Sequence, residues 1–171
     1  MGITVFEPAP TPDDEPSRQR EVEQSGALAL RGDTALQSLV EDVRETLQAS
    51  AAAVSIVYKE WHYVLAGSGL AAGAYSRRTS LCGHAIVTPG ELFLVCDLAA
   101  DDRFAGHPTM SEREPLRFYA GAPLRASAGP ALGTLCVFDR SPRRDLSAGD
   151  RAYLHRQAGM VVARLDRASP R

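Results

Sequence analysis

Cys82 and His84, separated by a single glycine, are the residues whose types and spacing most directly suggest chemistry. A thiol and an imidazole two residues apart could bind a metal ion or haem, or react with an oxidant. Structural zinc, however, usually needs four ligands in paired groupings, and Cys96, His107 and Cys136 do not supply such a pair nearby. The pattern therefore predicts no metal site and no catalytic residue, and it favours cysteines that pack as small apolar side chains.

A second group of residues combines carboxylates with guanidinium groups: Asp97, Asp101, Asp102, Arg103 and Arg117. The aspartates could perform acid/base chemistry or bind a divalent cation, but Asp in a loop typically accepts backbone N–H groups and fixes a turn. Arg103 is expected either to pair with one of these carboxylates or to hold an anionic ligand, for which a guanidinium group is well suited. The same two interpretations stay open for Arg117, because an Arg buried at the start of a strand needs a partner.

Hydrophobic periodicity predicts two helices that would support such a site. Apolar side chains recur every three or four positions over residues 33–49, which predicts a helix capped by Thr34 or, alternatively, by Asp33. A helix is also predicted for residues 147–166, where an apolar heptad stripe covers residues 154–165. A stripe of that kind favours packing of one helix against another.

Apolar runs between the helices predict strands, at residues 51–58, 61–67, 93–96, 118–124 and 132–138. The glycine-rich segment 67–78 is predicted to be a loop. The polar segment 97–114 is longer than most connections within a domain, which indicates a functional or mobile loop. We expect it to cap a pocket.

Six short motifs occur in a fixed order: Cys-Gly-His-Ala-Ile at 82–86, Val-Cys-Asp at 95–97, Asp-Asp-Arg-Phe at 101–104, Arg-Phe-Tyr-Ala-Gly-Ala-Pro-Leu at 117–124, Gly-Thr-Leu-Cys-Val at 133–137 and Asp-Arg-x-Pro-Arg at 139–143. This order resembles the GAF domains of bacterial histidine kinases and diguanylate cyclases, and weaker matches extend the resemblance to about residues 34–165. The resemblance implies an α+β fold. A GAF/PAS-like central antiparallel β-sheet would carry the N- and C-terminal helices on one face, and pocket-capping loops and short helices on the other.

The domain organisation expected from this resemblance is a single, stand-alone GAF domain at residues 26–166. Residues 1–25 are rich in proline and acidic side chains and are predicted to be a flexible lead, and residues 167–171 a tail. As an alternative, the apolar–polar alternation at residues 3–6 could add an extended segment to a neighbouring element or partner.

The resemblance further implies that the segment 80–87 forms a short helix at the pocket edge. His84 would then either face the cavity, where an imidazole can donate and accept hydrogen bonds, or support the helix. Trp61 is expected either in the core or, like a Trp of the family, near the pocket mouth. The candidate ligand-binding residues are Trp61, Ser80, Cys82, His84, Arg103, Arg117 and Tyr119.

From these features we expect a sensory or regulatory module that is not an enzyme. It would bind a small molecule between the sheet and the 97–114 loop, and signal through helix-mediated dimerisation or a partner protein. One alternative is a dimerisation or docking platform without a ligand. Another is a thiol enzyme like the free methionine-(R)-sulfoxide reductases, because the Cys82-Gly83 pair resembles a Cys-Gly pair in their sequences.

The charge, apolar runs and cysteine count of the sequence limit where the protein is expected to be located and which partners it is expected to have. The 171 residues carry a formal net charge of −2, so no basic field favours nucleic acid. No apolar run reaches the roughly 18 residues of a membrane span, and the N-terminus lacks secretory-signal features. The three cysteines are an odd number in apolar contexts, which favours reduced thiols. We therefore expect a cytoplasmic homodimer without a cofactor, whose partner is a histidine kinase, a cyclase or another signalling protein.

Overall fold

A six-stranded antiparallel sheet lies at the centre of the part of the chain that the structure describes. The computed structural model describes residues 5–90, 92–125 and 129–170. The strands follow the order β3-β2-β1-β6-β5-β4 across the sheet. Their bounds are β1 Ala51–Tyr58, β2 Trp61–Ser68, β3 Gly73–Ser76, β4 Phe93–Val95, β5 Phe118–Arg125 and β6 Ala131–Asp139.

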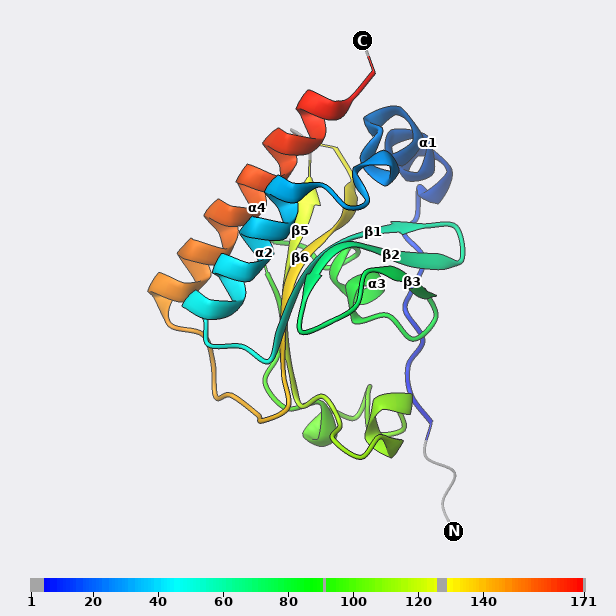
Figure 1. Cartoon of the computed structure of the whole chain (residues 1–171). Helices are drawn as coiled ribbons and strands as arrows, with labels where there is room; N and C mark the ends of the chain where they lie inside the picture. Colours follow the sequence, from blue (N-terminus) through cyan, green and yellow to red (C-terminus); the bar gives the residue numbers. More distant parts are fainter. Residues whose placement is uncertain (1–4, 91, 126–128, 171) are drawn as a thin grey trace.

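The helices divide between the two faces of this sheet (Figure 1). The α-helices are α1 Glu15–Ser25, α2 Thr34–Thr46, α3 Leu81–Ala85 and α4 Ala148–Ala168, and the 3-10 helices are Ala27–Leu30, Leu98–Ala100 and Pro108–Ser111. The long helices α2 and α4 lie side by side on one face, and α3 with the loop after β4 covers the other. This arrangement confirms the predicted α+β fold with a central antiparallel sheet.

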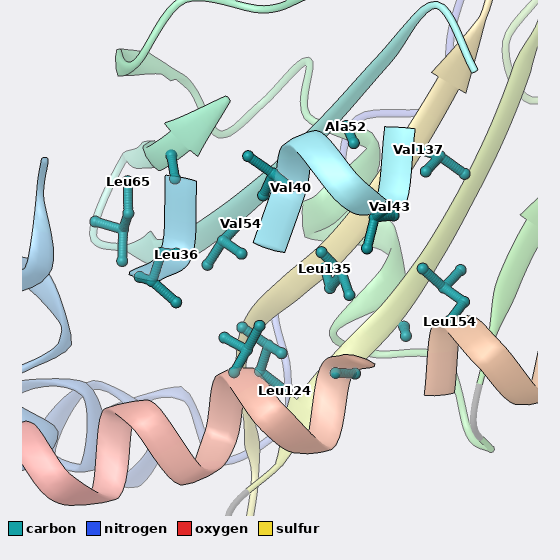
Figure 2. Packing of buried hydrophobic residues seen from close by; sticks show 14 of the residues in the cluster. Leu36, Val40, Val43, Ala52, Val54, Leu65, Leu124, Leu135, Val137 and Leu154 are labelled. Atoms are coloured by element: carbon teal, nitrogen blue, oxygen red, sulfur yellow. The ribbon is translucent and has the colours of Figure 1, made fainter. Parts of the chain in front are cut away.

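The first core lies between the sheet and the helices α2 and α4. Figure 2 shows Leu36, Val40 and Val43 of α2 pointing toward the strands, with Leu154 of α4 on the same side. Each of these side chains is buried, and burying one stabilises the fold by about 1.5–3 kcal/mol. The apolar stripe at 154–165 thus packs on the chain's own sheet, so it does not supply the helix-to-helix interface on which our dimer prediction depended.

A second core fills the space between the sheet and α3. It includes the aromatic side chains of Phe93, Phe104, Tyr119 and Phe138 together with aliphatic side chains and the small Cys82, and all of these are buried. The rings of Tyr119 and Phe138 meet edge to face, with 5.2 Å between their centroids. The space beneath α3 is therefore packed with side chains.

The N-terminal region differs from the flexible lead that composition predicted. Residues Glu15–Ser25 form α1, because Arg18 anchors this helix to the start of β6. Its guanidinium group is buried, lies 3.4 Å from the carbonyl oxygens of Ala131 and Leu132, and pairs with Glu15 at 2.7 Å. A buried Arg satisfied in this way holds a helix that has few apolar residues of its own.

The segment before α1 is extended and runs along the α3 side of the molecule (Figure 1). The backbone N–H of Glu7 donates to the carbonyl of Arg103 at 2.7 Å, and that of Ala9 donates to the carbonyl of Arg78 at 3.1 Å. Val5 and Phe6 belong to this segment, whereas Ile3 lies outside the described residues. The segment thus adds to neighbouring parts of its own chain, as the alternative prediction allowed.

One predicted loop contains a strand. Within residues 67–78, β3 pairs with β2 at the edge of the sheet, from Trp61 opposite Ser76 to Val64 opposite Gly73. The strand has only four residues, which are mostly exposed and carry no alternating apolar pattern. Its backbone pairing was therefore not readable from periodicity.

Candidate functional site

A pocket of about 300 Å³ opens beside α3, where the β2–β3 region meets the loop after β4. Residues of the predicted capping loop, from His107 to Glu112, line one side of it, and Ser80 and Leu81 at the start of α3 line another. The lining also includes His62, Tyr75, Phe138 and Arg140. The cavity is large enough for a small organic molecule.

His62 on β2 is the unsatisfied polar group of this pocket. Its side chain is 7% exposed, and its Nε2 atom has no hydrogen-bond partner among the described residues. Burial opposes protonation of the ring, but the charge of the nearby Cys82 sulfur and the hydrogen-bonding interaction with it together raise the pKa of His62 above its usual value. A buried imidazole nitrogen without a partner is costly, so this atom is suited to bind a ligand.

His107 and Ser80 shape the pocket wall. The Nε2 of His107 donates to the Thr79 carbonyl at 2.8 Å, and its Nδ1 accepts the Thr109 N–H at 3.2 Å, which defines a neutral tautomer. Ser80 caps α3, because its Oγ accepts the Gly83 N–H at 3.1 Å. The capping loop is thus tied directly to the residue before the α3 cap.

Cys82 and Tyr119 lie beneath α3, in the second core. Both are fully buried, and the Tyr119 hydroxyl donates to the Cys82 sulfur at 3.3 Å. Burial and the charge of the Cys82 sulfur raise the pKa of Tyr119 well above its usual value. Neither side chain belongs to the lining of the pocket.

His84 supports α3 and does not line the pocket. Its Nε2 donates to the Glu7 carbonyl at 3.1 Å, and its ring meets the edge of Phe104 at 5.0 Å and stacks on Phe93 at 6.1 Å. Burial lowers the pKa of His84 below its usual value. Of the two interpretations left open, supporting the helix fits these contacts.

Arg103 and Arg117 each form an ion pair with an aspartate of the same loop. Arg103 binds Asp101 through 2.7 and 2.9 Å hydrogen bonds and also lies over the rings of Phe93 and Phe104, whereas Arg117 binds Asp97 through 2.7 and 2.8 Å hydrogen bonds. The hydrogen bonds from these arginines lower the pKa of each aspartate. The contacts fix the loop, and neither Arg lines the pocket.

Ser80 alone among the seven predicted ligand-binding residues lines this pocket. Trp61 begins β2 with 47% of its surface exposed, so it lies neither in the core nor in the pocket lining. The sequence reasoning missed His62, Tyr75 and His107. The alternation of side chains along β2 could have identified His62, because its side chain must point to the opposite face of the sheet from those of Trp61 and Tyr63.

No group of three or more His, Cys, Asp and Glu side chains in the described part of the chain could hold a metal ion. Among the helices described, none combines the length and apolar character needed to cross a bilayer.

The sequence matches the profile of the GAF domain over residues 31–164. A cyclic di-GMP phosphodiesterase of Pseudomonas aeruginosa is 38% identical over 156 residues, which cover 91% of this chain and 26% of that protein. The chain therefore spans about a quarter of the length of this relative.

Many solved structures share the fold. The GAF domain of an Acinetobacter phosphoenolpyruvate-protein phosphotransferase superposes with a TM-score of 0.65 at 16% identity, covering 92% of this chain and 96% of that one. The type II free methionine-R-sulfoxide reductase of Thermoplasma acidophilum gives 0.63 at 14% identity, covering 84% and 97%. At these identities the likeness extends to the fold alone.

The Pseudomonas relative corrects one expectation. We expected a protein that is not an enzyme, and this is contradicted by a relative that is similar over 91% of the chain and is named a cyclic di-GMP phosphodiesterase. The six motifs that suggested a sensor all fall within the GAF region and carry no information about an activity located elsewhere in such a protein.

Proposed function

This chain belongs to the GAF domain family, and from that premise we propose that it senses a small molecule and regulates the hydrolysis of cyclic di-GMP. The link to cyclic di-GMP comes from the Pseudomonas phosphodiesterase, whose matching region is 38% identical. The proposed ligand site is the pocket beside α3.

The observation that carries the proposal is the unpartnered Nε2 of His62 in this pocket. A buried polar atom left without a hydrogen bond costs about 1–3 kcal/mol, and a ligand with one complementary group would recover that cost. Arg140 and Glu112 also line the pocket, and they offer a cation and an anion to a polar ligand.

A route for the signal starts at the α3 end of the pocket. Ser80 caps α3, and His84 of this helix holds the N-terminal segment through the Glu7 carbonyl. That segment leads into α1, whose last turn meets the end of α4 where the Ser169 hydroxyl donates to the Gln24 carbonyl at 3.0 Å. A ligand that favours one position of α3 would shift the population of states at these helix ends.

Native mass spectrometry tests whether the pocket holds a ligand. The purified protein, incubated with a bacterial metabolite extract, is expected to carry an extra non-covalent mass that denaturing spectra lack. His62→Phe should lose that mass, whereas Tyr63→Phe, on the opposite face of the same strand, should keep it. A wild-type protein that binds nothing from the extract contradicts the proposal.

Regulation is tested by replacing the matching region of the Pseudomonas phosphodiesterase with this chain. Adding the ligand found by mass spectrometry should change the rate of cyclic di-GMP hydrolysis by the chimera. The same chimera with His62→Phe should no longer respond. A rate that is independent of ligand in both chimeras would count against a regulatory role.

A further inference from the structure

Three hydroxyl groups converge on the sulfur of Cys82 in the second core, and the Cys136 thiol, which donates to the Ala53 carbonyl, lies beside it. The hydroxyls of Thr134, Ser55 and Tyr119 lie 3.1, 3.3 and 3.3 Å from this sulfur, and the Cys136 sulfur lies 3.8 Å away. A neutral thiol is a weak hydrogen-bond acceptor. Three hydroxyl donors around one sulfur therefore suit a thiolate better than a thiol. The arrangement is built from β1, β5 and β6 beneath α3.

The charges around this sulfur agree with the hydrogen bonds. Burial alone would raise the pKa of the Cys82 thiol, but the hydrogen bond with Cys136 and the nearby His62 ring lower it well below its usual value. The pKa of Cys136 is raised well above its usual value by burial and by the Cys82 sulfur. The pair is therefore polarised, with Cys82 as the nucleophile and Cys136 as the protonated partner.

Access to Cys82 is restricted to small reagents. The side chain is fully buried, yet Ser80 and Leu81 immediately before it and His62 beside it all line the pocket. A hydroperoxide as small as hydrogen peroxide is close to water in size, whereas bulky thiol reagents and thiol-containing peptides are too large to reach the sulfur.

We propose that Cys82 is a site of oxidation by small hydroperoxides and that Cys136 resolves the product as a Cys82–Cys136 disulfide. The Cys82 sulfur attacks one oxygen of ROOH, so an S–O bond forms while the O–O bond breaks, and the released RO⁻ takes a proton from the His62 imidazolium. The Cys136 sulfur then attacks the Cys82 sulfur, an S–S bond forms, and the hydroxyl leaves with the Cys136 proton as water. Overall, two thiols and ROOH give a disulfide, ROH and water.

This disulfide would join α3 to the central strand β6. Cys82 is on α3 and Cys136 on β6, two elements that are already in contact. Oxidation would thus fix the helix that borders the pocket. The reaction needs no ligand in the pocket, so its failure would leave the proposed function standing.

Cys96 serves as an internal control for the reactivity of Cys82. It is more exposed than Cys82, its sulfur donates to the Arg144 carbonyl at 3.1 Å, and burial raises the pKa of its thiol. Exposure alone would make Cys96 react first, whereas the proposal requires Cys82 to do so.

The test treats the folded, reduced protein with hydrogen peroxide and then blocks the remaining thiols with an alkylating reagent after unfolding. Peptide mapping of the wild-type protein is expected to find a Cys82–Cys136 disulfide, with a mass loss of two hydrogens, while Cys96 is still alkylated. Cys136→Ser should instead carry one added oxygen on Cys82, which dimedone traps when it is added as the protein is unfolded. Cys96→Ser should behave as the wild type.

The rate of disulfide formation provides a second test. His62→Phe removes both the cation that stabilises the Cys82 thiolate and the acid that protonates the leaving RO⁻, so disulfide formation should slow by at least roughly tenfold. The proposal is overturned if Cys82 stays reduced in the folded wild-type protein while Cys96 is oxidised, or if the oxidation rate of Cys82 is the same with and without His62.

Discussion

Glu15 of α1 and Arg77 of the β3–α3 connection form a 2.6 Å salt bridge, and the same carboxylate binds the buried Arg18 at 2.7 Å. Burial would raise the pKa of Glu15, but hydrogen bonds from Arg18 and Arg77 lower it to about 2. This carboxylate joins the N-terminal helix to the segment that leads into α3. It also leaves Arg18 paired in a place where water does not reach.

Glu15→Gln is expected to reduce the free energy of unfolding near neutral pH by roughly 2 kcal/mol, after allowing for solvent around the pair. Because the folded pKa lies below the unfolded value of 4.5, this contribution is present above about pH 4.5 and is lost as the pH falls toward 2. Urea unfolding at both ends of this range measures it. Glu21→Gln, on the exposed side of the same helix, is the control, and an equal loss at both pH values would contradict the assignment.

Arg117→Lys is expected to loosen the loop after β4 without unfolding the protein. Lysine keeps the charge but cannot form both hydrogen bonds to Asp97, and since both side chains are partly exposed the cost should be under about 1 kcal/mol. Limited proteolysis within residues 97–116 should become faster, and the exposed Arg113→Lys should not change it. Loss of a bound ligand in Arg117→Lys with unchanged proteolysis would instead support the ligand clamp that the sequence left open.

Gly133→Ala is expected to destabilise the protein by about 3 kcal/mol. A Cβ at this position would overlap the carbonyl oxygen of Ser55 on the neighbouring strand, where the β1–β2 register also shifts. Gly159→Ala is the matched control, because a Cβ there meets nothing within 4 Å and alanine favours a helix interior by about 1 kcal/mol. Thermal unfolding should therefore move in opposite directions for the two variants.

Sequence periodicity predicted most of the sheet and both long helices, because the spacing of their apolar residues matches the buried face of each element. Leu36, Val40 and Val43 recur at helical spacing, and they form the buried face of α2. Asp33, one of the two predicted caps, accepts the Leu36 N–H at 3.0 Å. The α1 helix was missed because its anchor is the charge of Arg18, which composition assigns to the surface.

The candidate site was harder to predict from the sequence, because its polar and charged residues carry no apolar pattern. Arg103 and Arg117 stood out as charged residues near aspartates, and those aspartates are their partners. His62 did not stand out, because its importance depends on an atom left without a partner by the packing of β1, β3 and α3 around it. Alternation along β2 places His62 opposite Trp61 and Tyr63, but the missing partner of its Nε2 depends on its neighbours in three dimensions.

The homodimer expected from the sequence is testable on the outer face of α4. Val161 is fully buried against the sheet, whereas the adjacent Met160 is 56% exposed on the outer side of α4. Val161→Asp should prevent folding, since it places an unpaired charge in the core. Met160→Asp should leave the free energy of unfolding within about 0.5 kcal/mol of the wild type.

Light scattering then separates the two roles of α4. If two copies associate through the outer face of this helix, the wild type at tens of micromolar has twice the mass of the Met160→Asp variant, and both are folded by circular dichroism. A wild-type protein that is monomeric at this concentration would contradict the homodimer. A dimer that survives Met160→Asp would place the interface elsewhere, because the inner stripe of α4 is already occupied by the sheet.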